Sequence, residues 1–263
     1  MPMRVASLAS GSSGNSYYIE CPEGAVIVDA GLSGRALLEN LVAAGGNPAK
    51  VQGIIITHDH NDHVAGAGVL QRRHGWKLWM TRGTRDASGK IGKVEVDYIR
   101  AGEGLSAAGM NFEFYKTPHD AVEPILVTIS RKNERCGICT DLGHPFPGLA
   151  ELLEQLDFVF LESNFDPDLL AKNPRYPYPL KARIRGDHGH ITNQQAAELV
   201  AGVKGGRLRK VVLSHLSEEN NRPELAMQCF RSVASARIEA VGMRVGTAWR
   251  HKAMLLSCVG QGM

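Results

Sequence analysis

A short run of metal-ligand side chains directly after an apolar stretch constrains this chain more than any other feature. Residues 51–56 have the apolar, β-branched character of a buried strand. They run into four ligand-type side chains within six positions: His58, His60, Asp62 and His63. Alternation along an extended chain puts the first two on one side, and a turn into a following helix can present the last two nearby. Imidazole and carboxylate bind zinc and related divalent ions, so the run predicts a metal site at a strand end.

The order of the predicted elements indicates an α/β fold. Strands come first in runs and later alternate with helices, which predicts mixed layers with the helices outside. We expect strands at residues 4–8, 17–20, 25–29, 51–56, 77–80, 94–100, 111–116, 125–130, 135–140, 158–161, 210–213 and 253–259. We expect helices at residues 33–42, 64–73, 149–156 and 193–203, and a further one opening at Pro223. Residues 171–189 form the longest segment without periodicity, and such loops are usually functional or mobile.

Composition excludes several classes of protein. The five cysteines are an odd number in a chain of 263 residues, which is no disulfide framework. The net charge of +3, from 30 basic and 27 acidic residues, excludes a histone-like nucleic-acid binder but permits a local basic patch. No stretch reaches the apolar length of a membrane span, and the first residues lack the apolar core of a signal peptide. We therefore expect a cytoplasmic protein with reduced thiols.

The run from Thr57 to His63 resembles the signature of the metallo-β-lactamase fold in its dinuclear hydrolase form. The resemblance implies a four-layer αββα sandwich, with residues 1–263 forming a single domain. It also implies further ligands, each after a strand, and candidates occur in the expected order: His119, Asp141 and His215. Asp29 matches an early family aspartate that resembles a supporting residue more than a ligand.

Three further segments resemble one particular group within this fold. Residues 9–16, 189–193 and 213–221 are similar to segments of the YycJ (WalJ) group, bacterial exonuclease-like members of this fold. In the segment 189–193, Ile191 and Thr192 are conservative departures from the group's pattern. The group is associated with 5′-to-3′ DNA exonuclease activity. The resemblance therefore implies a nucleic-acid substrate, with DNA expected before RNA.

The resemblance also assigns the ligands to two metal ions. It places His58, His60 and His119 on one ion, and Asp62, His63 and His215 on the other, with Asp141 bridging them. A hydroxide between the ions would be the nucleophile, and Asp62 would belong to the catalytic centre. With two divalent ions, two carboxylates and a hydroxide, the site keeps about one positive charge, which favours an anionic phosphodiester. Zinc is the first expectation, and manganese or iron also suit these donors.

Other side chains are candidates for contact with the substrate. The Gly-rich loop offers Ser12, Ser13 and Asn15 to phosphate oxygens, although a plain hairpin turn explains it equally. His190 is a candidate for protonating the leaving group, or a solvent-facing loop histidine. Residues 172–186 carry five basic side chains and no acidic one, interleaved with tyrosines, which suits a single strand. From this segment we expect substrate contacts at Arg175, Tyr176, Lys181, Arg183 and Arg185, against the alternative of an ordinary solvated loop.

Two other functions remain open at this stage. A glyoxalase-type thioester or lactone hydrolase can carry the same run of ligands. A non-catalytic protein that binds metal or nucleic acid is also compatible, since a fold does not fix a function. His74, His144 and His251 carry no predicted role.

Overall fold

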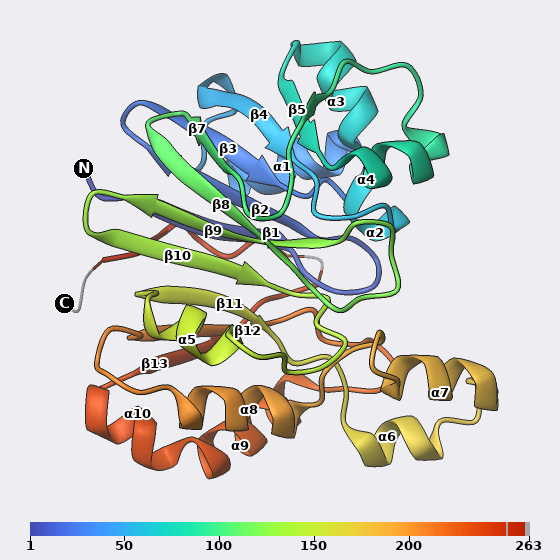
Figure 1. The fold of residues 1–263 in the computed structure, drawn as a ribbon, viewed down its shortest axis with the longest axis vertical. Helices are drawn as coiled ribbons and strands as arrows, with labels where there is room; N and C mark the ends of the chain where they lie inside the picture. Colours follow the sequence, from blue (N-terminus) through green and yellow to red (C-terminus); the bar gives the residue numbers. More distant parts are fainter. Residues whose placement is uncertain (251, 261–263) are drawn as a thin grey trace.

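Two mixed β-sheets face each other across the centre of the molecule (Figure 1). The computed structural model describes residues 1–250 and 252–260, so His251 lies outside the described residues. One sheet has the order β14-β1-β2-β3-β4-β5-β6, with β1 (Arg4–Ala9), β2 (Ser16–Cys21), β3 (Gly24–Val28), β4 (Val51–Ile55), β5 (Lys77–Met80), β6 (Asp97–Tyr98) and β14 (Ser257–Cys258). The other has the order β13-β12-β11-β10-β9-β8-β7, with β7 (Gly104–Ala107), β8 (Met110–Lys116), β9 (Ile125–Arg131), β10 (Glu134–Cys139), β11 (Phe158–Glu162), β12 (Lys210–Ser214) and β13 (Arg244–Thr247).

Helices cover the outer face of each sheet, which gives the predicted four-layer αββα sandwich (Figure 1). The first sheet is covered by α1 (Gly34–Ala43), α3 (Ala67–His74) and α4 (Arg82–Ala87). The second is covered by α5 (Leu149–Glu154), α8 (Asn193–Gly202), α9 (Pro223–Val233) and α10 (Ser235–Val241). Three short helices lie beyond the sheet ends: α2 (Asn61–Val64), α6 (Pro167–Lys172) and α7 (Tyr178–Arg185). Two 3-10 turns, η1 (Pro48–Lys50) and η2 (Gly89–Ile91), complete the described elements.

The main core lies between the two sheets. Tyr17 of the first sheet packs on Phe160 of the second, with ring centroids 4.8 Å apart. Strand alternation puts Cys136 into this core and Cys139 among the helices on the other face, so the two thiols do not form a pair. All five cysteines lie within the described residues and are free. Burying each large apolar side chain stabilises the sandwich by about 1.5–3 kcal/mol.

Several elements differ from those expected from the sequence. The segment 171–189 contains the helix α7 rather than only a loop, since Pro177 is its N-cap and Pro179 lies in the first helical turn, where proline fits. The single helix expected at 64–73 is divided, because the amide of Gly66 donates to the carbonyl of Ala30 and the carbonyl of His63 accepts from the amide of Ala30, instead of continuing the helix. The strands expected at 94–100 and 253–259 shorten to two residues each, and β7 and β13 were not expected. Among the described residues, no helix has the length and apolar character needed to cross a membrane.

Candidate metal centre

The candidate site lies where the ends of central strands from both sheets meet. Strands β3 and β4 are parallel in one sheet, and β10, β11 and β12 are parallel in the other. Loops that follow the carboxyl ends of parallel strands meet at one edge of a sheet. The ligand-type residues at or just after these strand ends are Asp29, His58, Asp141, Glu162 and His215.

Three of these residues hold a left-handed backbone. The φ angles are 61° at Asp29, 59° at Asp141 and 55° at His215. For a residue with a side chain this conformation costs on the order of 1 kcal/mol and needs support from its surroundings. The amide of Asp29 donates to the carbonyl of Ile55 at 2.8 Å, and the amide of His215 donates to Ser10 Oγ at 2.7 Å. The supported turns reverse the chain directly after the strands and aim the side chains at one point.

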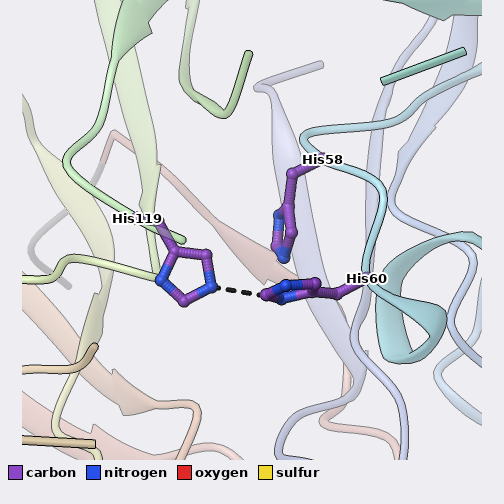
Figure 2. Close-up of side chains that lie close together, drawn as sticks. All are labelled: His58, His60 and His119. Carbon is purple, nitrogen blue, oxygen red and sulfur yellow. Dashed lines mark hydrogen bonds between the residues drawn. The ribbon is translucent and has the colours of Figure 1, made fainter. Parts of the chain in front are cut away.

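The first triad consists of His58, His60 and His119, and its rings converge in Figure 2. One ring nitrogen of each lies within 4.8 Å of the others, and His119 Nε2 is 3.2 Å from His60 Nδ1. His119 is oriented by its Nδ1–H, which donates to the carbonyl of Gly189 at 3.0 Å. Thr57 Oγ1 lies 3.0 Å from Nδ1 of His58 and orients that ring. Such outer hydrogen bonds leave the inner nitrogens free to bind a metal.

The second triad consists of Asp62, His63 and His215, whose ligand atoms also lie within 4.8 Å of one another. Both rings are oriented by buried carboxylates rather than by neutral groups. His63 Nδ1 donates to Asp29 Oδ2 at 2.8 Å, and His215 Nδ1 lies 3.0 Å from Glu162 Oε1. The sequence thus places six predicted ligands in two groups, and the structure brings each group together.

Asp141 lies between the two triads. Its Oδ1 atom is 3.6 Å from His119 Nε2, a nitrogen of the first triad. Its Oδ2 atom is 3.4 Å from His63 Nε2, a nitrogen of the second. The carboxylate is nearly fully buried, so its charge acts on both groups with little screening.

The unpaired atoms of the site match the needs of a divalent metal ion. Within residues 1–250 and 252–260, Nε2 of His58, Nε2 of His215 and Oδ2 of Asp141 are buried without a hydrogen-bond partner. Leaving a buried polar atom unpaired costs about 1–3 kcal/mol, so such atoms cluster where something else is bound. Imidazole nitrogens and carboxylate oxygens are suitable ligands for zinc and related metals. The site therefore fits the predicted divalent metals.

Electrostatics differ between the two triads. Burial lowers the pKa of His58 well below its usual value, and burial also lowers the pKa of His119. Burial lowers the pKa of His63 too, but Asp141, Asp29 and Asp62 outweigh it and raise that pKa to about 9. The pKa of His215 is likewise raised well above its usual value, because Asp141, Asp62 and Glu162 outweigh the effect of burial.

Glu162 is a site residue that the sequence analysis missed. Its side chain is fully buried at the end of β11, and Oε1 lies 2.8 Å from His190 Nδ1 as well as 3.0 Å from His215 Nδ1. Its Oε2 accepts from the backbone amides of Leu142 and Ile191. Burial raises the pKa of Glu162, but His190 and His215 outweigh this and lower it. The signal that could have identified Glu162 in the sequence is its carboxylate at the end of an apolar strand. Asp29 and His215 likewise stand at the ends of apolar strands.

The Gly-rich loop contributes in two different ways. Asn15 is fully buried, and its Nδ2 lies 3.2 Å from Asp62 Oδ2 and 3.0 Å from His63 Nε2. This position differs from the substrate contact expected from the sequence, because Asn15 holds two predicted ligands. Ser12 is exposed and lines the cavity over the triads. Ser13 is also exposed but does not line this cavity.

The cavity over the triads has a volume of about 390 Å³. Its lining includes Asp62, Asp141, His190 and His215 from the centre, and Tyr176 and Arg183 from the segment of α7. Arg175, Lys181 and Arg185 lie outside this lining. The side chain of His190 is 19% exposed, so the ring reaches the cavity while Glu162 holds its other nitrogen.

Four basic side chains in and around α7 are paired or hydrogen-bonded within the protein. Arg183 pairs with Asp120, and Arg175 pairs with Glu219 at 2.8 Å. Lys181 Nζ donates to the carbonyl of Ala171 at 2.7 Å. Arg185 Nε donates to the carbonyl of Lys181 at 3.4 Å. Much of the local positive charge is therefore balanced or held against the protein.

The chain belongs to the metallo-β-lactamase superfamily, whose family profile matches residues 9–189. The superfamily and the two triads together identify a metal-dependent hydrolase. Among curated proteins, the chain is similar to an exodeoxyribonuclease WalJ of Streptococcus pneumoniae, with 35% identity over 83% of each chain. It is 33% identical to an exodeoxyribonuclease YycJ of Bacillus anthracis, over 95% of this chain and 94% of that one.

A solved structure supports the fold. The metallo-β-lactamase fold protein YhfI from Bacillus subtilis superposes with a TM-score of 0.73 at 18% identity. The match covers 96% of this chain and 99% of YhfI. At this identity the likeness concerns the fold alone.

Proposed function

We propose that this metal-dependent hydrolase is a DNA exonuclease that acts in the 5′-to-3′ direction. The observation that carries the proposal is the pair of triads joined by Asp141, beneath a cavity open to the substrate. Relatives at 33% and 35% identity named exodeoxyribonucleases support DNA as the substrate. The direction rests on the resemblance to the YycJ (WalJ) group.

We assign the predicted ligands to two divalent ions, with zinc expected first and manganese or iron compatible. His58, His60 and His119 would hold one ion, Asp62, His63 and His215 the other, and Asp141 would contact both. When bound, a pair of divalent ions supplies Lewis acidity, acidifies water and stabilises the attacking and leaving oxygens of a phosphodiester. The protein holds the ligands in place through Asp29, Thr57, Glu162 and Gly189.

His190 is the proposed proton donor to the leaving oxygen. Glu162 accepts a hydrogen bond from Nδ1 of His190, which directs the opposite nitrogen of the ring toward the cavity. A carboxylate behind an imidazole keeps the ring oriented for proton transfer. Asp62 also lines the cavity and would act at the metal centre.

Digestion of labelled DNA by metal-stripped and metal-restored protein tests the proposal. We expect chelation to abolish the release of nucleotides from 5′-labelled single-stranded DNA, and zinc or manganese to restore it. An acyl-glutathione assayed in parallel tests the glyoxalase-type alternative. Undiminished cleavage by metal-free protein would overturn the proposal, as would thioester hydrolysis without DNA cleavage. Tight DNA binding without turnover across several metals would favour a non-catalytic protein.

A further inference from the structure

Beside Arg183, the wall of the cavity around α7 carries three apolar or aromatic side chains, whereas the rest of the lining is polar. Tyr176, Leu180 and Ile184 lie four positions apart, and all three line the cavity beside the metal centre. We call this set the α7 face. Leu180 and Ile184 share one side of α7, Tyr176 lies just before the N-cap Pro177, and each of the three is partly exposed. The side chains of Leu180 and Ile184 take no part in the hydrogen bonds of the metal centre.

The α7 face is held rigidly opposite the ligands. The amide of His190 donates to the carbonyl of Ile184 at 3.0 Å. Gly189 packs so closely on the end of α7 that a Cβ there would lie 2.3 Å from the carbonyl oxygens of Arg183 and Ile184. The ion pair of Arg183 with Asp120 adds a further link. Arg183 is thus a positioning residue that links α7 to the loop carrying His119.

The remaining walls of the cavity are polar. Ser12, Asn164 and Ser217 line it together with the charged floor of Asp62 and Asp141. With divalent ions held at the triads, a ligand that fits presents an apolar side to the α7 face and an anionic, polar side to the rest of the lining. A nucleotide has this division, because its base is flat and stacks on apolar or aromatic side chains while its sugar and phosphate are polar.

We propose that the α7 face binds the base of the terminal nucleotide while the adjoining phosphodiester lies over the triads. This inference rests on the proposed function. A volume of about 390 Å³ is near the lower end of small-molecule sites, which places one nucleotide between α7 and the metal centre. The strand is therefore shortened by one nucleotide at each cut. Since Leu180 and Ile184 offer no hydrogen-bonding group, the preference among the four bases is weak.

Binding without turnover tests the contact directly. With metal-loaded protein, the Kd for a fluorescent, 5′-phosphorylated oligothymidine whose phosphorothioate linkages resist cleavage is expected to rise about tenfold in the double variant Leu180→Ala/Ile184→Ala. Tyr176→Ala has a similar effect, and Tyr176→Phe restores the wild-type Kd because it keeps the ring. Val69→Ala removes an exposed aliphatic side chain from helix α3 and serves as the matched control. Unchanged affinity in both the double variant and Tyr176→Ala would overturn the proposal.

The products of the metal-loaded protein give a second, separate readout. We expect mononucleotides as the first labelled product, and first products of two or more nucleotides would overturn the inference. Hydrolysis of bis(p-nitrophenyl) phosphate separates this failure from that of the proposed function. If wild-type protein cleaves neither this diester nor DNA, the proposed nuclease activity fails. If it cleaves both and the α7 variants digest DNA like wild type, only the role of the α7 face fails.

Discussion

The two triads contain similar ligands but lie in opposite electrostatic surroundings. In the first triad, neutral groups orient the rings: Thr57 for His58 and the carbonyl of Gly189 for His119. In the second, the carboxylates of Asp29 and Glu162 orient them. Burial therefore lowers the pKa of His58 and His119 and keeps them neutral, whereas the carboxylates raise the pKa of His63 and His215 and favour their protonation when no metal is bound. His58 and His119 can thus bind a metal ion without losing a proton, whereas His63 and His215 must release protons before they bind one.

The largest expected effect comes from removing the residue that the two triads share. Asp141→Ala is expected to lose metal and DNA cleavage together, by more than the roughly 10–100-fold cost of replacing a group that only supports a ligand. Metal analysis and single-strand digestion of the same preparation measure both losses. Asp97→Ala, at an exposed carboxylate of β6, is the matched control. Retained cleavage in Asp141→Ala protein would show that the triads work without their shared carboxylate.

Asp29→Asn should weaken metal binding at the second triad more than at the first. It keeps an acceptor for His63 and Thr57 but removes the buried charge behind the second triad. We expect metal affinity at that triad to fall about 10–100-fold, with metal content moving from two ions per chain toward one. Titration with a competing chelator measures this change. Asp166→Asn is the control, because Asp166 caps α6 and asparagine caps equally well. Equal loss at both triads would contradict the comparison.

The protonation difference predicts a pH dependence confined to metal-stripped protein. The pKa of His63 is about 9 in the folded chain, above the usual value of 6.5, so its contribution to stability is complete below pH 6.5. That contribution is lost as the pH rises through about 9. The Tm of stripped protein should therefore fall between pH 6.5 and 9.5 more than the Tm of metal-loaded protein. Calorimetry at pH 7 in two buffers should also show release of about two protons on saturation with zinc.

The smallest expected effect is that of Thr57→Val. The substitution preserves shape but removes the hydroxyl that orients His58 in the first triad. Asp29 also loses the hydrogen bond from this hydroxyl, but it keeps those from the Thr57 amide and from His63. A neutral hydrogen bond contributes about 0.5–1.5 kcal/mol, so metal affinity should fall only about 2- to 10-fold. The chelator titration used for Asp29→Asn allows a direct comparison. If both variants lose affinity equally, the charge of the supporting group does not distinguish the triads.

Local patterns predicted the mixed layers of the fold and the ligand run after the strand at 51–56, and the resemblance to the metallo-β-lactamase fold supplied the ligands after the later strands. The run from His58 to His63 follows an apolar strand, and His119, Asp141 and His215 also come after strands. Glu162 was missed because one carboxylate at a strand end has no neighbouring ligand to distinguish it. Helix α7 was missed because only Leu180 and Ile184 give it periodicity, and its function depends on a cavity that forms only in three dimensions.

The left-handed backbone at Asp29, Asp141 and His215 has an evolutionary consequence. Glycine at these positions would adopt the same backbone angles without steric cost. In a lineage that no longer required the activity, substitution by glycine would relieve this backbone strain and remove the metal centre at the same time. Selection for hydrolysis must act continuously against this drift, and a degenerate copy of the protein would be expected to fold well while its metal centre decayed.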